Sequence, residues 1–222
     1  ELANSILKAY GFDERIHLIM ANAMDDIATV SKAMGALRQR GSLSAICTPT
    51  SIDLSNQKRE TLEAVLEHLQ KQAKTPLPEA GVALPKSSLL GGLTINKDAC
   101  TLCMSCVGSC PEGALLDNPD EPILSFIEKQ CVQCGICTQT CPEHALTLAP
   151  RLQTVEQRKQ RVKLNETEPF HCISCGKVFG TLKMVDLMMT KLGAHGAFAG
   201  AAMDRLKMCG DCRVVDMVKK ET

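Results

Sequence analysis

Eight of the thirteen cysteines in this 222-residue chain fall into two runs with the same spacing. The runs are Cys100, Cys103, Cys106 and Cys110 before Pro111, and Cys131, Cys134, Cys137 and Cys141 before Pro142. A loop with a thiol at every third residue can place thiolates on three corners of an iron–sulfur cubane while its backbone N–H groups point at the sulfides. The proline fixes φ and turns the chain away after the fourth cysteine. The spacing therefore predicts two 4Fe-4S clusters and one-electron chemistry.

The fourth cysteine of each run is expected to bind the other cluster. The double run resembles the ligand pattern of bacterial two-cluster ferredoxins, in which this crossing occurs. Cluster I would take Cys100, Cys103, Cys106 and Cys141, and cluster II would take Cys131, Cys134, Cys137 and Cys110. Residues 111–115 also match residues 142–146, which predicts a duplicated loop and helix with pseudo-two-fold symmetry. Gly113 favours a turn with positive φ, and His144 at the equivalent place indicates that glycine is not obligatory there.

Composition, cysteine spacing and the lack of a visible signal peptide favour a redox protein of the cytoplasm. Eight cysteines could instead form a disulfide framework, but the regular spacing and the lack of a visible signal peptide argue against a secreted domain. Hydrophobic residues make up 45% of the chain without an apolar run of about 18 residues, so no membrane span is expected. Only 3% of the residues are aromatic, so we expect metal sites to supply much of the local order.

The net charge is zero but unevenly distributed. Residues 98–149 carry seven acidic side chains against one basic residue, Lys129, whereas residues 151–222 carry thirteen basic and eight acidic. An acidic cluster region can steer a basic redox partner, although solvation alone would also explain it. The basic stretch Arg158, Lys159, Arg161 and Lys163 is expected to be a solvated linker or helix face. It has no interleaved aromatic residues, so no nucleic-acid partner is predicted.

A second metal motif lies near the end of the chain. It consists of two C-x2-C pairs, Cys172 with Cys175 and Cys209 with Cys212, separated by thirty-three residues. Such pairs favour a structural four-thiolate zinc site in a zinc-ribbon-like tail, with Gly176 permitting a tight knuckle. The alternatives are a third iron–sulfur cluster, a redox-active dithiol and an empty site. Helices are expected at residues 182–192 and 212–220, the second with Cys212 at its N-terminus.

We expect no metal at the remaining candidate ligands. His171 is expected to lie beside the tail site or at the surface, because four thiolates already suffice there. His195 is placed in a loop, and His17 and His68 in a strand and a helix. Cys47 is interpreted as a buried small hydrophobic residue.

The segment before the clusters differs in character. Apolar residues at helical spacing predict helices around 27–37 and 62–69, and a helix at 2–10 should stop at Gly11. Short apolar runs at 16–20 and 43–47 predict two parallel strands. Because a parallel pair needs more strands and two covered faces, and because Glu1 stands where an initiator Met is expected, we expect a fragment of a longer protein with a larger sheet.

The predicted fold class is α+β, in five segments. They are an α/β segment at 1–72, a linker at 73–96, a two-cluster ferredoxin domain at 97–150, a second linker at 151–169 and a metal-binding tail at 170–222. Gly91 and Gly92 are assigned to a loop of the first linker, and no nucleotide-binding glycine motif occurs.

Residues 97–216 also resemble a wider family. The stretches Ala99–Leu115, Asp117–Asp120, Cys131–Gly135, Glu168–Lys177 and Met208–Val215 are similar to the C-terminal part of bacterial polyferredoxin-like proteins associated with formate dehydrogenase. The resemblance implies 4Fe-4S binding by both runs, a second metal motif in the last four cysteines and further clusters outside this sequence. We therefore expect an electron carrier rather than an enzyme, with redox proteins, including a dehydrogenase, as partners. The competing hypothesis is an iron–sulfur protein for redox sensing, assembly or regulation.

Overall fold

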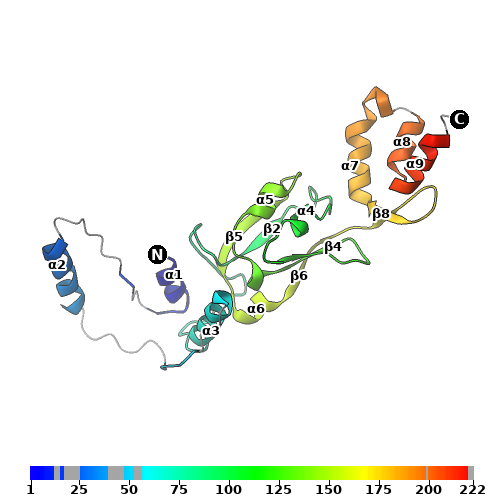
Figure 1. The fold of residues 1–222 in the computed structure, drawn as a ribbon. Coiled ribbons are helices and arrows are strands. Elements are labelled where there is room, and N and C mark those ends of the chain that lie inside the picture. The colour runs from blue at the N-terminus through cyan, green and yellow to red at the C-terminus, as the bar shows by residue number, and fades with distance from the viewer. Residues whose placement is uncertain (13–15, 18–25, 40–47, 53–56, 199, 220–222) are drawn as a thin grey trace. The chain divides into compact units, whose positions relative to one another are not determined.

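The computed structural model describes residues 1–12, 16–17, 26–39, 48–52, 57–198 and 200–219 (Figure 1). Its helices are α1 (Leu2–Ala9), α2 (Asp26–Gln39), α3 (Lys58–Lys71), α4 (Ser105–Gly108), α5 (Ile136–Thr140), α6 (Val155–Lys159), α7 (Leu182–Gly193), α8 (Ala201–Leu206) and α9 (Gly210–Lys219), with 3-10 turns η1 (Glu128–Gln130) and η2 (Gly196–Phe198). Its strands are β1 (Val82–Ala83), β2 (Gly91–Ile95), β3 (Leu115–Leu116), β4 (Ile123–Ile127), β5 (Leu146–Leu152), β6 (Arg161–Glu166), β7 (Pro169–His171) and β8 (Val178–Thr181). Helices mixed with small antiparallel sheets agree with the α+β class.

Contacts group the chain into two units. Unit 1 comprises residues 1–88 and 150–158, and unit 2 comprises residues 89–149 and 159–222. The five segments inferred from the sequence stay a prediction about domain boundaries. Strands β1, β2, β6 and the helix α6 all lie in stretches that the sequence assigned to linkers, so those stretches are structured. Gly91 and Gly92, assigned to a loop, are buried residues of β2, and that assignment was wrong.

Unit 2 is organised around strand β4. This strand pairs antiparallel with β3 on one side and with β6 on the other. Leu124 and Phe126 of β4 are buried, together with Leu115 of β3 and Leu164 of β6. These side chains pack against the buried cysteines of both runs. The small sheets therefore supply the apolar walls of the cysteine sites.

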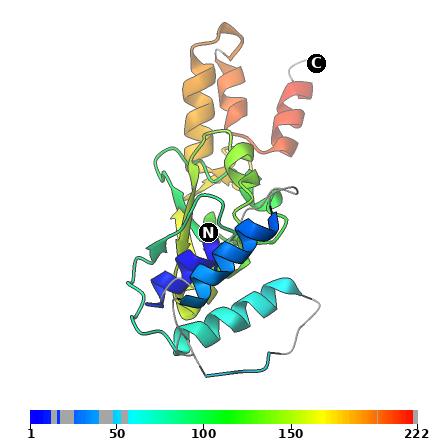
Figure 2. The same ribbon diagram turned by 90° about the vertical axis from the view of Figure 1, so that its left-hand side faces the viewer.

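The tail within unit 2 consists of a hairpin and three helices. Strands β7 and β8 pair antiparallel, and α7, α8 and α9 follow (Figures 1 and 2). Thr181 caps α7 by accepting a hydrogen bond from the N–H of Met184 at 3.1 Å. The predicted helices at 182–192 and 212–220 correspond to α7 and α9, although α9 begins two residues earlier, at Gly210.

Unit 1 has its own core around α1 and α3. Tyr10 and Leu66 are fully buried there, and Gly11, with φ at +77°, ends α1 as predicted. Arg158 is also fully buried and forms a 2.8 Å ion pair with Glu63. The interpretation of Arg158 as part of a solvated stretch was therefore wrong, because its guanidinium has a buried carboxylate partner that the sequence pattern does not reveal. Burial raises the pKa of Tyr10 to about 12, so this phenol stays neutral.

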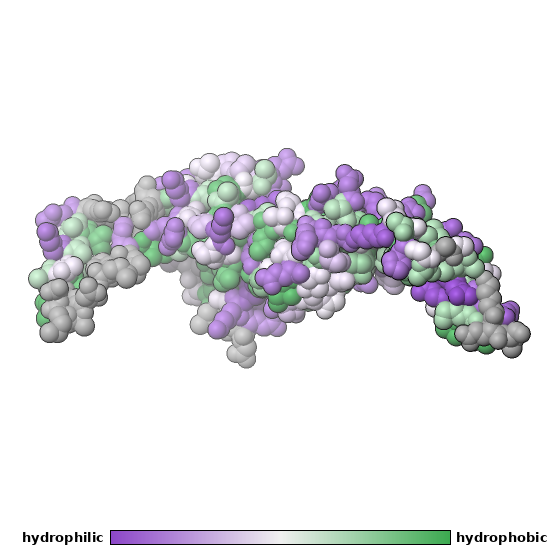
Figure 3. Space-filling view, turned by 90° about the horizontal axis from the view of Figure 1, so that it is seen from above, coloured by the Kyte–Doolittle hydropathy of each residue, from purple (hydrophilic) through white to green (hydrophobic). Residues whose placement is uncertain are grey.

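The predicted parallel strand pair lies largely outside the described residues. Residues 18–20 and 43–47, with Cys47, are not described, and the described Ile16 and His17 are not in a strand. The helices predicted around 27–37 and 62–69 correspond to α2 and α3. Ile27 of α2 is 89% exposed, and α9 also exposes apolar residues. The visible face in Figure 3 accordingly shows hydrophobic residues interspersed among hydrophilic ones.

Candidate functional site

The two cysteine runs have the same pattern of exposure. In each run the first and third cysteines are buried, the second is exposed and the fourth is half-buried. The third cysteine of each run lies on a short helix, Cys106 on α4 and Cys137 on α5. The repeated spacing thus produces a repeated arrangement, with one thiol of each run, Cys103 or Cys134, open to solvent.

The backbone repeats as well, and it does so with unusual dihedral angles. Leu102 and Gln133 occupy the same place in their runs and have φ of +53° and +55°. Gly113 and His144 follow with +60° and +48°. Positive φ at non-glycine residues costs roughly 1–2 kcal/mol each, so the loops are held by their surroundings. The predicted positive φ at Gly113 is confirmed, and His144 shows that the turn tolerates another residue.

Each of two cavities in unit 2 is lined by four cysteines. One cavity is lined by Cys100, Cys103, Cys106 and Cys141, with Leu102, Leu124 and Leu146 among its walls. The other is lined by Cys110, Cys131, Cys134 and Cys137, with Leu93, Leu115 and Phe126. Three thiols in each cavity come from one run and the fourth from the other run. The chain folds so that neither run closes a cavity by itself.

Several N–H groups donate hydrogen bonds to these sulfurs. The backbone N–H of Ala114 donates to Cys110 Sγ and that of Ala145 donates to Cys141 Sγ, each at 3.3 Å. Gln133 donates to Cys131 Sγ from its backbone at 3.4 Å and from its side chain at 3.3 Å. Gln133 was not among the residues predicted from the sequence. Aligning the two runs reveals it, because Leu102 stands at the equivalent position.

The thiols in the cavities suit a cationic cluster rather than free thiolates. Burial, with the added charge of neighbouring thiolates, raises the pKa of Cys106 to about 12 and that of Cys137 to about 11. Several buried thiolates therefore need metal charge to coexist. Four thiols in an apolar cavity with N–H donors at their sulfurs are the donor set of a 4Fe-4S cluster, so the residues fit that group.

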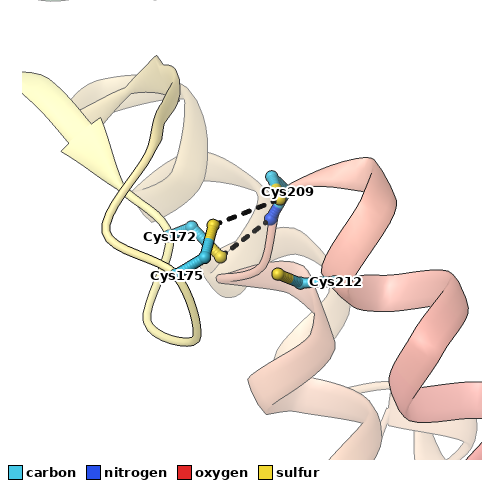
Figure 4. A group of neighbouring side chains, drawn as sticks. All are labelled: Cys172, Cys175, Cys209 and Cys212. Atoms are coloured by element: carbon cyan, nitrogen blue, oxygen red, sulfur yellow. Dashed lines mark hydrogen bonds between the residues drawn. The ribbon is translucent and has the colours of Figure 1, made fainter.

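The four tail cysteines converge much more tightly. Their Sγ atoms all lie within 4.8 Å of one another, and Cys175 Sγ is 3.7 Å from Cys209 Sγ (Figure 4). Among the described residues, the eight cysteines of the two runs do not form a group of this single-ion kind. Four thiolates around one ion at a Zn–S distance of about 2.3 Å stand roughly 3.8 Å apart. The distance between Cys175 Sγ and Cys209 Sγ matches that spacing, and the other sulfurs lie within 4.8 Å of one another.

The two tail pairs come from different structural settings. Cys172 and Cys175 lie in the turn of the β7–β8 hairpin, where Gly176 has φ of +74°, as a tight knuckle requires. Cys209 precedes α9 and Cys212 lies in its first turn, so the second pair is on a helix terminus and not on a second hairpin. The predicted zinc-ribbon-like tail is therefore not confirmed, because only the first pair lies in a hairpin turn.

Hydrogen bonding distinguishes the thiols of the tail. Burial acts to raise the pKa of Cys172, but backbone N–H groups, led by that of Cys209 at 3.3 Å, outweigh it and lower the pKa to about 6. A hydrogen bond from Ser174 acts to lower the pKa of Cys212, but neighbouring thiols outweigh it and raise the pKa to about 12. The thiolate of Cys172 therefore forms readily, whereas a cation is needed to keep all four thiols deprotonated.

The histidines do not join these sites in the described structure. His171 is exposed and its Nδ1 lies 3.0 Å from the carbonyl oxygen of Gly176, beside the tail site. His195 follows α7 in a turn, as predicted, and His68 lies in α3. Among the described residues, only the tail cysteines bring their ligand atoms close enough together to bind one metal ion. None of the described helices combines the length and apolarity needed to cross a membrane.

Comparison with known families supports 4Fe-4S binding by this chain. Residues 99–146 match one family model described as a 4Fe-4S dicluster domain, and residues 123–177 match a second with the same description. A comparison with curated proteins gives no match. The matched ranges overlap and together contain both cysteine runs. They indicate iron–sulfur binding and an electron-carrier module rather than a catalytic enzyme, with redox proteins as partners.

Proposed function

We propose that this chain relays single electrons through two 4Fe-4S clusters with crossed ligands. Cluster I is bound by Cys100, Cys103, Cys106 and Cys141, and cluster II by Cys131, Cys134, Cys137 and Cys110. The observation that supports this assignment is the pair of cavities, each lined by one of these sets. Residues 97–150 form the two-cluster segment in this proposal, and residues 170–222 form a metal-binding tail.

The protein's contribution to electron transfer is to hold and insulate the clusters. Each cluster, when bound, accepts and releases one electron. Four cysteine ligands leave no open corner for a substrate, which suits a relay and not substrate chemistry. Leu124 and Phe126 exclude water from the buried sides, whereas exposed Cys103 and Cys134 bring each site to the surface. Electrons would enter and leave at those two exposed thiolates.

The tail is proposed to bind one structural zinc ion through Cys172, Cys175, Cys209 and Cys212. The supporting observation is the convergence of four Sγ atoms within 4.8 Å. In a 4Fe-4S cluster each thiolate binds a different iron, so the sulfurs stand farther apart than around one ion. One observation favours the alternative of a third iron–sulfur cluster, because the second family match extends to residue 177 and includes Cys172 and Cys175. We favour zinc on geometry.

The proposed partners are redox proteins of the cytoplasm, with a formate dehydrogenase as the first candidate because of the polyferredoxin resemblance. The acidic side chains of residues 98–149 would attract a basic docking surface.

A relay and a redox sensor can be separated by experiment. Anaerobically reconstituted chain is mixed with formate and the formate dehydrogenase of its host, and the visible absorbance of the clusters is followed. Rapid, reversible bleaching supports the relay and the formate link. Reversible reduction by dithionite without reduction by formate supports a relay with another partner. Loss of clusters on contact with oxygen, with a change in partner affinity and no electron exchange, supports the sensor.

A further inference from the structure

The two cysteine loops repeat each other in backbone and exposure but differ at one internal position. Leu102 lies between the first two cysteines of the first run, and Gln133 lies at the same place in the second. Both have positive φ, +53° and +55°, so the two side chains leave equivalent backbone positions. Leu102 is apolar and buried in the core, whereas Gln133 brings a primary amide next to a cluster ligand.

The amide of Gln133 is held in one orientation. Its Nε2 donates to Cys131 Sγ at 3.3 Å and to the carbonyl oxygen of Gly92 in β2 at 3.0 Å. Turning the amide over would place its oxygen against the Gly92 oxygen, and two acceptors repel each other. The Oε1 atom is buried and accepts no hydrogen bond from the described residues. Burying an acceptor without a hydrogen-bond partner costs free energy. The amide is held in the orientation that donates to sulfur despite this cost.

We propose that Gln133 is a positioning residue that raises the reduction potential of cluster II through Cys131 Sγ. This inference rests on the proposed function, because it takes Cys131 as a cluster II ligand. Reduction adds negative charge that is shared by the thiolate sulfurs, and an N–H donor at the sulfur stabilises that charge. The donor is partly buried, so solvent screens the effect weakly.

Cluster I is tuned by different groups in this account. The hydroxyl of Ser105 lies 3.4 Å from Cys103 Sγ and donates to it when the sulfur is a thiolate. That contact is exposed, so water competes for both atoms. The residue equivalent to Ser105 in the second loop is Ile136, whose side chain has no hydrogen-bond donor. Removing the Gln133 amide should therefore move the potential of one cluster and leave the other unchanged.

The test compares Gln133→Met and Gln133→Leu with Gln139→Leu in the full 222-residue chain. Gln139 is exposed on α5 and lines neither cavity, so it controls for loss of an amide near cluster II. Iron content and thermal midpoint are measured first, and the two midpoint potentials are then measured by EPR-monitored titration. We expect full iron content in all variants, a more negative potential for one cluster in both Gln133 variants, and native potentials in Gln139→Leu.

The outcomes separate this inference from the proposed function. Native protein without two 4Fe-4S clusters contradicts the proposed function itself. Two clusters with unchanged potentials in the Gln133 variants contradict only the role of Gln133. If both variants fail to load cluster II, native protein with glutamine labelled by 15N only at the side-chain amide answers the same question by pulsed EPR. A 15N coupling to one reduced cluster supports the contact, and its absence overturns it.

Discussion

Two sets of cysteines in unit 2 use the same thiol chemistry in different geometries. The eight cysteines of the two runs surround two cavities, and each cavity takes its fourth cysteine from the other run. The four tail cysteines instead close on one point from two neighbouring C-x2-C pairs. Apolar residues of β2–β4 line the first sites, whereas the tail site lies between a hairpin turn and a helix terminus.

In the proposed assignment, the number of cysteines in a run and the way the runs are connected distinguish a cluster site from a single-ion site. Runs of three thiols spread over a loop keep sulfurs apart and leave room for inorganic sulfide. The tail pairs have the same two-residue gap, but one pair lies in a hairpin turn and the other at a helix terminus, and together they bring four sulfurs within reach of one ion. In the proposed assignment, the crossed ligands tie both clusters to one domain, whereas the tail ion would stabilise only its own segment.

The largest expected effect comes from breaking the crossed connectivity. Cys110→Ala should remove cluster II and about half of the iron, because each cluster needs four thiolates. Adding Cys131→Ala should remove little more iron, since both residues serve the same cluster, whereas adding Cys100→Ala should remove nearly all of it. Iron and sulfide analysis of the three variants measures this. Near-complete loss of iron with Cys131→Ala, and little further loss with Cys100→Ala, would reverse the ligand assignment.

Removing one tail ligand should leave the clusters intact. Cys175→Ser is expected to release zinc and expose the tail to protease, because the binding energy of a structural ion is largely folding energy. Ile173→Ser places the same hydroxyl at an exposed position of the same turn and should keep the zinc. Limited proteolysis, zinc analysis and visible absorbance are compared. If Cys175→Ser instead lowers the iron content by about the four irons of one cluster, the tail holds a third cluster.

In unit 1, the buried group to compare with the cysteine sites is the ion pair of Arg158 and Glu63. Arg158→Ala should lower the free energy of unfolding of unit 1 by about 3–5 kcal/mol, because it leaves the Glu63 carboxylate buried and unpaired. Lys71→Ala breaks the solvent-exposed pair with Glu67 and should cost about 0–1 kcal/mol. Urea denaturation followed by circular dichroism measures both. Equal losses in the two variants would mean that burial does not govern the Arg158 contact.

The smallest effect sharpens the comparison between the two runs. Gly113→Ala should cost about 1 kcal/mol, because it places a side chain at φ of +60° where nothing else crowds it. His144→Gly relieves the same strain at the equivalent turn and should be neutral or slightly stabilising. Thermal midpoints of the loaded proteins check the opposite signs. A stabilising Gly113→Ala would show that the pseudo-symmetry does not extend to backbone strain.

Some of these features follow from the sequence and others do not. The positive φ at Gly113 and the helices α3 and α7 are local consequences of residue type and spacing, so they were predictable. The burial of Arg158 depends on Glu63, which lies 95 residues earlier, and no local pattern encodes that contact. Gln133 was visible only in the difference between two nearly equal loops. The hydrogen bond from its amide to sulfur depends on β2, which supplies Gly92.

Metal content of one sample tests the central claim most directly. Anaerobically reconstituted full chain is analysed for iron, acid-labile sulfide and zinc, with EPR of the reduced protein. Two clusters with crossed ligands and one tail ion predict about eight iron, eight sulfide and one zinc per chain. About twelve iron without zinc would place a third cluster in the tail. A reproducible value near four iron, despite excess sulfide, would contradict the two-cluster account.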